Sequence, residues 1–180
     1  MKRRMHSRRP VVEQFESRNL LSAGVTGLHA PAAVSAQPIQ LIVPLDGTFR
    51  GQFTETERGL VAVFSFSGRG NVRRIGEFSL NGTIDAGGPV IVKVGGTFVL
   101  KGAAGSITVE LTAAHNTTVP SAGPPIHYTY KIIHGTGMYT NAVDHGTATL
   151  TASATGGAPG RQHGHFELVM TSAFPEPASK

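Results

Sequence analysis

Residues 126–135 read IHYTYKIIHG, and the alternation within this stretch decides the fold class. Apolar side chains at Ile126, Tyr128, Tyr130 and Ile132 are separated by the polar side chains of His127, Thr129 and Lys131. Successive side chains of a strand point to opposite faces of a sheet, so this pattern predicts a β-strand with one buried face. By the same parity, His134 falls on the buried face with the two tyrosines.

The same alternation recurs on both sides of this stretch. Seven further segments show it, at residues 47–54, 59–68, 71–80, 89–102, 105–114, 146–154 and 163–174. The turn signals are Asp46-Gly47, Gly68-Arg69-Gly70, Asn81-Gly82, Gly87-Gly88 and Gly135-Thr136-Gly137. No segment keeps a helical period for three turns, and consecutive hairpins favour antiparallel pairing. The sequence therefore predicts an all-β fold over residues 37–174. We expect a single antiparallel β-barrel of roughly eight strands, with a sandwich as the alternative.

Charge is concentrated at the start of the 180-residue chain, which carries a formal net charge of +5. Five of the 16 Lys and Arg residues (Lys2, Arg3, Arg4, Arg8 and Arg9) precede the first acid, and the remaining 11 balance the 11 Asp and Glu residues. The body of the protein therefore lacks the field that attracts phosphates, and we expect no nucleic-acid partner. Because there is no Cys, a disulfide framework and a thiolate metal site are excluded.

Residues 1–36 form a basic leader, which we expect to be disordered, as is the tail at 175–180. A basic start and small residues around Ala32 and Ala36 fit a secretory signal, whereas Glu13 and Glu16 interrupt its apolar part. From the residues alone, export and a basic arm remain open alternatives. No apolar run reaches about 18 residues, so we expect no transmembrane segment.

The stretch FESRNLLSA within this leader resembles the LEPR-XLL motif, which is found near the N-termini of exported or envelope-associated proteins of planctomycete bacteria. The matching or substituting positions are Phe15, Glu16, Arg18, Leu20, Leu21 and Ser22, with Ser17 in place of Pro. The resemblance implies that the protein is secreted or located in the cell envelope. A mature chain beginning between Ala30 and Pro38 is then expected, with an envelope protein as a possible partner.

Residues 135–150, GTGMYTNAVDHGTATL, resemble a segment that recurs in barrels of the allene oxide cyclase and dirigent type. The matching positions are Gly135, Thr136, Gly137, Tyr139, Ala142, Gly146 and Leu150, whereas Asp144 replaces a glycine. The closing GHFELVM is similar to the last strand of those barrels. The resemblance implies a barrel with Tyr139 covering one end, a possible homo-oligomer, and a cyclase- or isomerase-like activity as one alternative. It transfers no catalytic residue, because this chain lacks a matching acid or proton-donor motif.

A candidate ligand site lies on the face expected to point inward. The interior of an eight-stranded barrel just fits side chains or one small ligand. The expected lining residues are Phe64, Phe66, Phe78, Tyr128 and Tyr130, with Arg74 and His134 as polar exceptions in register with apolar positions. The alternative is a filled core in which each tyrosine hydroxyl bonds to a neighbour.

The closing strand offers a candidate metal site, because His163 and His165 share a face with Glu167. The alternative places all three on the solvated face, since Phe166, Leu168 and Met170 take the other. Neither a cysteine nor a Gly-x-Ser-x-Gly turn supplies a nucleophile, and Glu77, Glu110 and Glu167 alternate with apolar neighbours as surface residues do. We therefore expect a non-enzymatic domain, without a cofactor, that binds a small apolar ligand or a surface partner.

Overall fold

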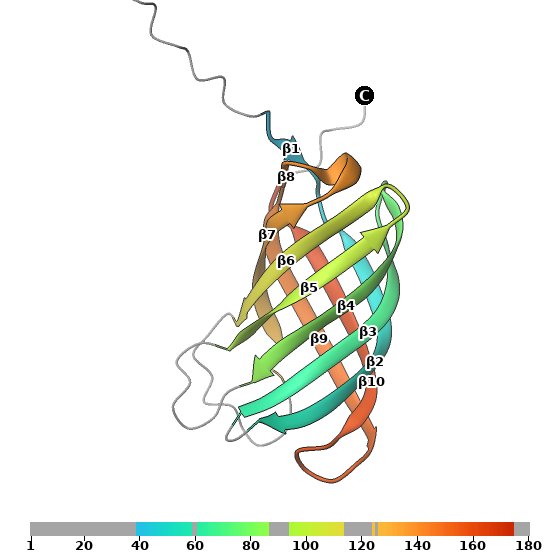
Figure 1. Ribbon diagram of the computed structural model, residues 1–180, viewed down its shortest axis with the longest axis vertical. Helices are drawn as coiled ribbons and strands as arrows, with labels where there is room; N and C mark the ends of the chain where they lie inside the picture. Colours follow the sequence, from blue (N-terminus) through green and yellow to red (C-terminus); the bar gives the residue numbers. More distant parts are fainter. Residues whose placement is uncertain (1–38, 59–60, 87–93, 114–123, 125, 175–180) are drawn as a thin grey trace, which may run out of the picture. The chain divides into compact units, whose positions relative to one another are not determined.

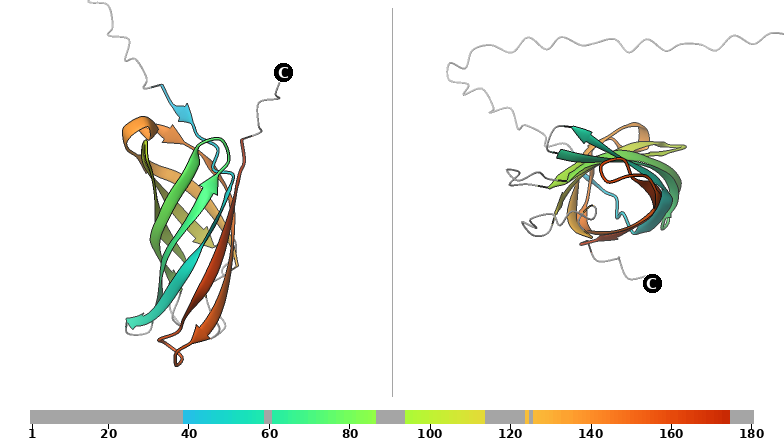
Figure 2. Two further views of the ribbon diagram at one scale, coloured as in Figure 1. Left: turned by 90° about the vertical axis from the view of Figure 1, so that its right-hand side faces the viewer. Right: turned by 90° about the horizontal axis from the view of Figure 1, so that it is seen from below.

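The computed structural model describes residues 39–58, 61–86, 94–113, 124 and 126–174. Within them, eight strands close a barrel in the order β10-β2-β3-β4-β5-β6-β7-β9, and every neighbouring pair is antiparallel (Figures 1 and 2). The predicted barrel is therefore confirmed. Its strands are β2 (Gly47–Arg58), β3 (Val61–Val72), β4 (Gly76–Ala86), β5 (Gly95–Gly102), β6 (Gly105–Ala113), β7 (His127–Gly135), β9 (His145–Gly156) and β10 (His163–Ser172).

Contacts divide the chain into Met1–Ala36 and Gln37–Lys180. The first unit, with the sorting-motif positions Phe15 to Ser22, lies outside the described residues, as does the tail at 175–180. The expectations for both segments stay predictions.

One end of the barrel, called the upper end here after its place in Figure 1, carries three short elements. They are β1 (Leu41–Ile42), the 3-10 helix η1 (Gly137–Tyr139) and β8 (Ala142–Val143). β1 pairs in parallel with β8, and the chain then passes into the barrel through Val43 and Leu45, both buried. The segment at residues 43–45 thus fills the upper mouth of the barrel. Tyr139 lies at this end, with its ring centroid 5.7 Å from that of Phe78.

The interior is packed with phenylalanine rings that lie over glycines. Phe66 makes edge-on contacts with Phe98 and Phe166, at centroid distances of 5.5 and 5.2 Å. A Cβ added at Gly51 or Gly68 would lie 2.9 Å from the Phe166 ring, so these positions must be glycine for the ring to fit.

The expectation that Gly68-Arg69-Gly70 and Asn81-Gly82 form turns is wrong, because both lie inside continuous strands.

The turn between β3 and β4 lies where the sequence predicts a continuous strand. Val72 pairs with Gly76, and Arg74 stands at the apex of the intervening turn with φ 69°. Parity survives on both sides, since Val72 and Phe78 point inward, but the apex residue is exposed. Arg74 therefore does not line the interior, contrary to expectation.

A β-bulge in β7 reverses the parity on which the expectation for His134 depends. Val109 of β6 pairs with Ile132 and Thr108 pairs with His134, so Ile133 is an extra residue without a partner in the ladder. Ile133 and His134 are consequently both exposed. His134 lies on the outer face and not among the interior residues.

Candidate functional site

The five aromatic residues predicted to line the interior are all buried in the barrel: Phe64, Phe66, Phe78, Tyr128 and Tyr130. Their surroundings differ. The phenylalanines pack among other apolar side chains, whereas the tyrosines bring hydroxyl groups into the interior. Whether the interior offers a ligand site therefore depends on the hydrogen-bond partners of these two hydroxyls.

Tyr130 donates its hydroxyl proton to a carboxylate that the sequence-based interpretation did not select. Asp144, between β8 and β9, is the one buried charged side chain among the described residues. The distance from Tyr130 Oη to Asp144 Oδ2 is 2.6 Å. Burial, followed by this hydrogen bond and the charge of Asp144, raises the pKa of the Tyr130 hydroxyl. The hydroxyl is therefore held as a proton donor.

Asp144 accepts three more hydrogen bonds. The backbone N–H of Leu45 donates to Oδ2 at 2.7 Å, while Ser172 Oγ and the backbone N–H of His145 donate to Oδ1 at 2.7 and 2.8 Å. A carboxylate offers about four acceptor positions, so these donors saturate both oxygens. We call this group the Asp144 clasp: Asp144, Leu45, Tyr130, His145 and Ser172. It joins the chain at Leu45 to the middle of β7, through Tyr130, and to the upper ends of β9 and β10.

Tyr128 lies two residues earlier on the same face of β7, and its hydroxyl has no hydrogen-bond partner. Only 1% of the residue is exposed. Of the buried side-chain nitrogen and oxygen atoms in the described part of the chain, this is the one that lacks a partner. Its cross-strand neighbours are Ala113 on β6 and Ala148 on β9, whose side chains cannot reach it with a polar atom. Burial raises the pKa of the Tyr128 hydroxyl, so it too remains protonated.

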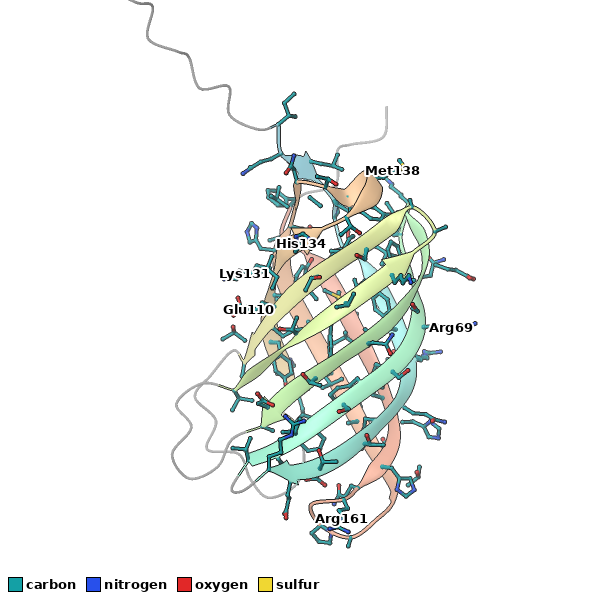
Figure 3. The ribbon with its side chains drawn as sticks, in the orientation of Figure 1. Arg69, Glu110, Lys131, His134, Met138 and Arg161 are labelled. Carbon is teal, nitrogen blue, oxygen red and sulfur yellow. The ribbon has the colours of Figure 1, made fainter. Side chains whose placement is uncertain are left out.

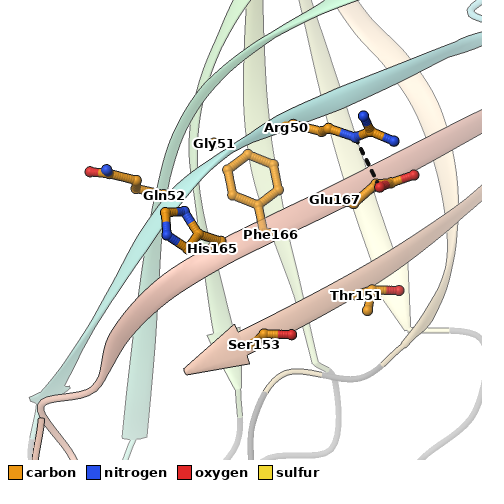
Figure 4. Close-up of a pocket in the computed structure, with 8 residues that line it drawn as sticks. All are labelled: Arg50, Gly51, Gln52, Thr151, Ser153, His165, Phe166 and Glu167. Carbon is orange, nitrogen blue, oxygen red and sulfur yellow. Dashed lines mark hydrogen bonds and ion pairs between the residues drawn. The ribbon is translucent and has the colours of Figure 1, made fainter. Parts of the chain in front are cut away.

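His163 and His165 lie exposed on the outer face of β10, as the solvated alternative describes. Figure 4 shows a shallow outer groove shared by β2, β9 and β10, where His165 lies near Gln52 and Ser153. In the same groove Arg50 Nε donates to Glu167 Oε2 at 3.0 Å. The described residues contain no cluster of three His, Cys, Asp or Glu side chains able to hold a metal ion, so none of them joins the two histidines as a third ligand.

Within the described residues, fold and site together define a class: a closed antiparallel barrel with an aromatic interior, a carboxylate clasp at its upper end and one unpartnered interior hydroxyl. The chain matches no protein-family model, no curated protein and no solved structure. None of the described residues forms a helix long and apolar enough to cross a bilayer.

Proposed function

We propose that the protein is an exported or envelope-associated barrel that binds a small, largely apolar molecule without catalysing a reaction. The observation that carries this proposal is the Tyr128 hydroxyl, which is buried and has no partner. Leaving such a group unsatisfied costs about 1–3 kcal/mol, so a bound molecule that accepts its hydrogen bond recovers that free energy. The leader resemblance supports the exported location.

The surroundings of Tyr128 define the chemistry of this ligand. Because burial raises its pKa, the hydroxyl stays protonated and can donate a hydrogen bond to an acceptor such as a ketone or ether oxygen. The neighbours Ala113 and Ala148 offer only small apolar surface. A charged ligand would lose its hydration here without an opposite charge to replace it. The preferred ligand is therefore uncharged, with one acceptor oxygen on an apolar body.

Among the described residues, no free acid or base lies near Tyr128, which favours binding over the cyclase- or isomerase-like alternative. Asp144 is the one buried charged group of the described residues, and four donors occupy its two oxygens. A carboxylate saturated in this way is poorly placed to take a proton from a substrate. Its bonds instead join separate segments of the chain, which is a structural role.

Binding is tested with prodan, an uncharged naphthyl ketone whose emission reports the polarity around it. We expect saturable binding by the full chain and about tenfold weaker binding by Tyr128→Phe, the effect of about 1.4 kcal/mol for one hydrogen bond. A naphthalene hydrocarbon without the ketone should bind both proteins equally. Equal prodan binding by the two proteins, or none by either, would overturn the interior site.

The location is tested separately by mass spectrometry of the protein from fractionated cells of its own source. Export predicts a chain that begins between Ala30 and Pro38 in the envelope or the medium. An intact Met1 to Ala23 segment in the cytosol would contradict export and leave the ligand proposal untouched.

A further inference from the structure

A row of basic side chains crosses the outer face of the barrel from strand to strand. Arg50 of β2 lies directly opposite Arg69 of β3, Arg69 lies opposite Ser79 of β4, and Ser79 lies opposite Lys101 of β5. Each of the four follows an inward position of its strand, so their side chains point away from the interior. Figure 3 shows Arg69 on this outer side. We call Arg50, Arg69, Ser79 and Lys101 the cation row.

Two of the three cations in this row lack a counter-charge within the described part of the chain. Like charges directly opposite each other on neighbouring strands destabilise a sheet. Arg50 is neutralised by Glu167, since Arg50 Nε lies 3.0 Å from Glu167 Oε2. The side chains of Arg69 and Lys101 make no ion pair and no hydrogen bond with any described residue. An anion bound between Arg69 and Lys101 would supply the missing counter-charge.

The cation row lines two shallow outer grooves. The groove over β3, β4 and β5 has a volume of about 590 Å³, and its lining includes Arg69, Ser79 and Lys101. Ser79, which is half-buried between the two cations, can donate its hydroxyl proton to an oxyanion there. The groove over β2, β9 and β10, of about 610 Å³, begins at Arg50, directly opposite Arg69.

The groove over β2, β9 and β10 offers side chains of a second kind. Besides the ion pair of Arg50 with Glu167, it contains Gln52, Ser153 and His165, all exposed (Figure 4). Amide, hydroxyl and imidazole groups both donate and accept hydrogen bonds, which is what the hydroxyl groups of a sugar require. A ligand lying along the cation row would therefore meet cations over β3 to β5 and hydroxyl-binding groups over β2, β9 and β10.

We propose that the cation row binds an acidic polysaccharide, with an acid group held between Arg69 and Lys101. One exposed ion pair contributes little, so a single small anion would bind weakly, whereas a chain that repeats its acid groups makes several such contacts at once. Nucleic acid fits less well, because no large aromatic side chain is exposed among the described residues for a base to stack on. The inference depends neither on the leader nor on the interior ligand site.

Calorimetric titration of the full chain with dextran sulfate and with polygalacturonate tests the cation row, with unsulfated dextran as the neutral probe. The stronger of the two acidic chains tells whether the acid group is a sulfate ester or a carboxylate. Arg69→Gln/Lys101→Gln should bind it about tenfold more weakly, because two ion pairs are lost. The matched control is Arg58→Gln/Arg161→Gln, which removes two exposed cations at the lower end of the barrel (Figure 3 labels Arg161). It has the same net charge and the same leader, and it should bind nearly as the wild type does in about 0.1 M salt, where distant charges are screened.

Glu77→Gln provides a second test of opposite sign. Glu77 is exposed and lines the same groove as Arg69 and Lys101, so its carboxylate repels an acid group bound there. Removing that charge should tighten binding about threefold, and a gain of this kind cannot arise from a misfolded variant.

Four results would overturn the proposal. Arg69→Gln/Lys101→Gln could bind the acidic chains as the wild type does, the control variant could lose as much, or Glu77→Gln could leave the affinity unchanged. Single-stranded DNA could also bind more tightly than either acidic polysaccharide and lose as much in Arg69→Gln/Lys101→Gln. The last result would assign the cation row to nucleic acid.

Discussion

Replacing Asp144 by Asn is the sharpest test of how the upper end is held together. The side chain keeps its shape, but an NH2 group takes the place of one oxygen and faces donors that previously had an acceptor. Both buried donors, the Leu45 N–H and the Tyr130 hydroxyl, bond to Oδ2, so the amide keeps them only by placing its oxygen there and its NH2 group opposite the His145 N–H and Ser172 Oγ. The Ser172 hydroxyl can turn and accept from the NH2 group, but the His145 N–H loses its acceptor, and an unpaired donor costs about 1–3 kcal/mol, so we expect a loss of about 2 kcal/mol in the free energy of unfolding.

This loss is large against the total, because domains of this kind are stable by about 5–15 kcal/mol. Urea unfolding followed by far-UV circular dichroism measures it directly, since the chain contains no Trp for fluorescence. Tyr130→Phe removes one donor and leaves Asp144 three, so it should cost about 1–2 kcal/mol. The double variant should show a coupling of about 1 kcal/mol or more, because the two groups share one bond.

The control is Glu167→Gln, which removes a carboxylate that is exposed and paired with Arg50 at 3.0 Å. An ion pair of this kind on the surface is worth less than about 1 kcal/mol. If Asp144→Asn cost no more than Glu167→Gln, the clasp would not hold the N-terminal segment. Fully additive effects of Asp144→Asn and Tyr130→Phe would likewise refute the bond between them.

Three further outcomes follow from the same interior. Tyr128→Phe should leave stability unchanged or raise it by about 1 kcal/mol in thermal unfolding, since it deletes an unpaired buried hydroxyl, whereas a loss above about 1 kcal/mol would show a hidden partner. Burial raises the pKa values of Tyr128 and Tyr130 from 10.0. Titration of the two hydroxyls therefore leaves the free energy of unfolding unchanged below pH 10.0 and lowers it as the pH rises above 10.0, because the tyrosines of the unfolded chain ionise first. Their tyrosinate absorbance should therefore appear only together with loss of the β-sheet signal, and its earlier appearance would contradict their burial. Phe166→Ala should cost about 3–5 kcal/mol in urea unfolding, because the ring over Gly51 and Gly68 leaves a cavity, and a cost below about 1 kcal/mol would mean that the ring is not packed there.

The alternation of inward and outward side chains was the main basis of the fold prediction. It failed where a β-bulge adds one residue to a strand. Over 105–113 and 126–132 the alternation matches the buried positions, except that Ile126 lies before its strand and is exposed. Beyond Ile132 the bulge at Ile133 moves His134 to the outer face. Nothing in the composition of KIIHG marks a bulge, because the extra residue is apolar like its neighbour. The turn at Arg74 was missed for a related reason, since no Pro, Asn or Gly occupies its apex.

Gly68 was misinterpreted as a turn residue, although the sequence contained the signal that it lies within a strand. Gly51 shares its parity with Phe49 and Phe53, and Gly68 shares its parity with Phe64 and Phe66. A glycine in the inward register of a strand rich in phenylalanine makes room for a ring from another strand. The register of a glycine relative to its apolar neighbours therefore distinguishes a glycine within a strand from one that ends a strand. A turn-like dipeptide alone does not make this distinction.

The difference between Tyr128 and Tyr130 could not have been predicted from their positions. The two residues share one strand, one face and one chemistry, and they differ only in whether a partner lies within reach. That partner is Asp144, and its own environment includes a backbone N–H from Leu45, 99 residues away in the sequence.

The same bond sets a limit on where the proposed processing of the chain can occur. Because Val43 and Leu45 are part of the core, the barrel requires the chain from Val43 onward. Processing after Ala30 to Pro38 leaves the clasp intact, whereas removal of Leu45 would open the upper mouth and leave the buried Asp144 without one of its four donors.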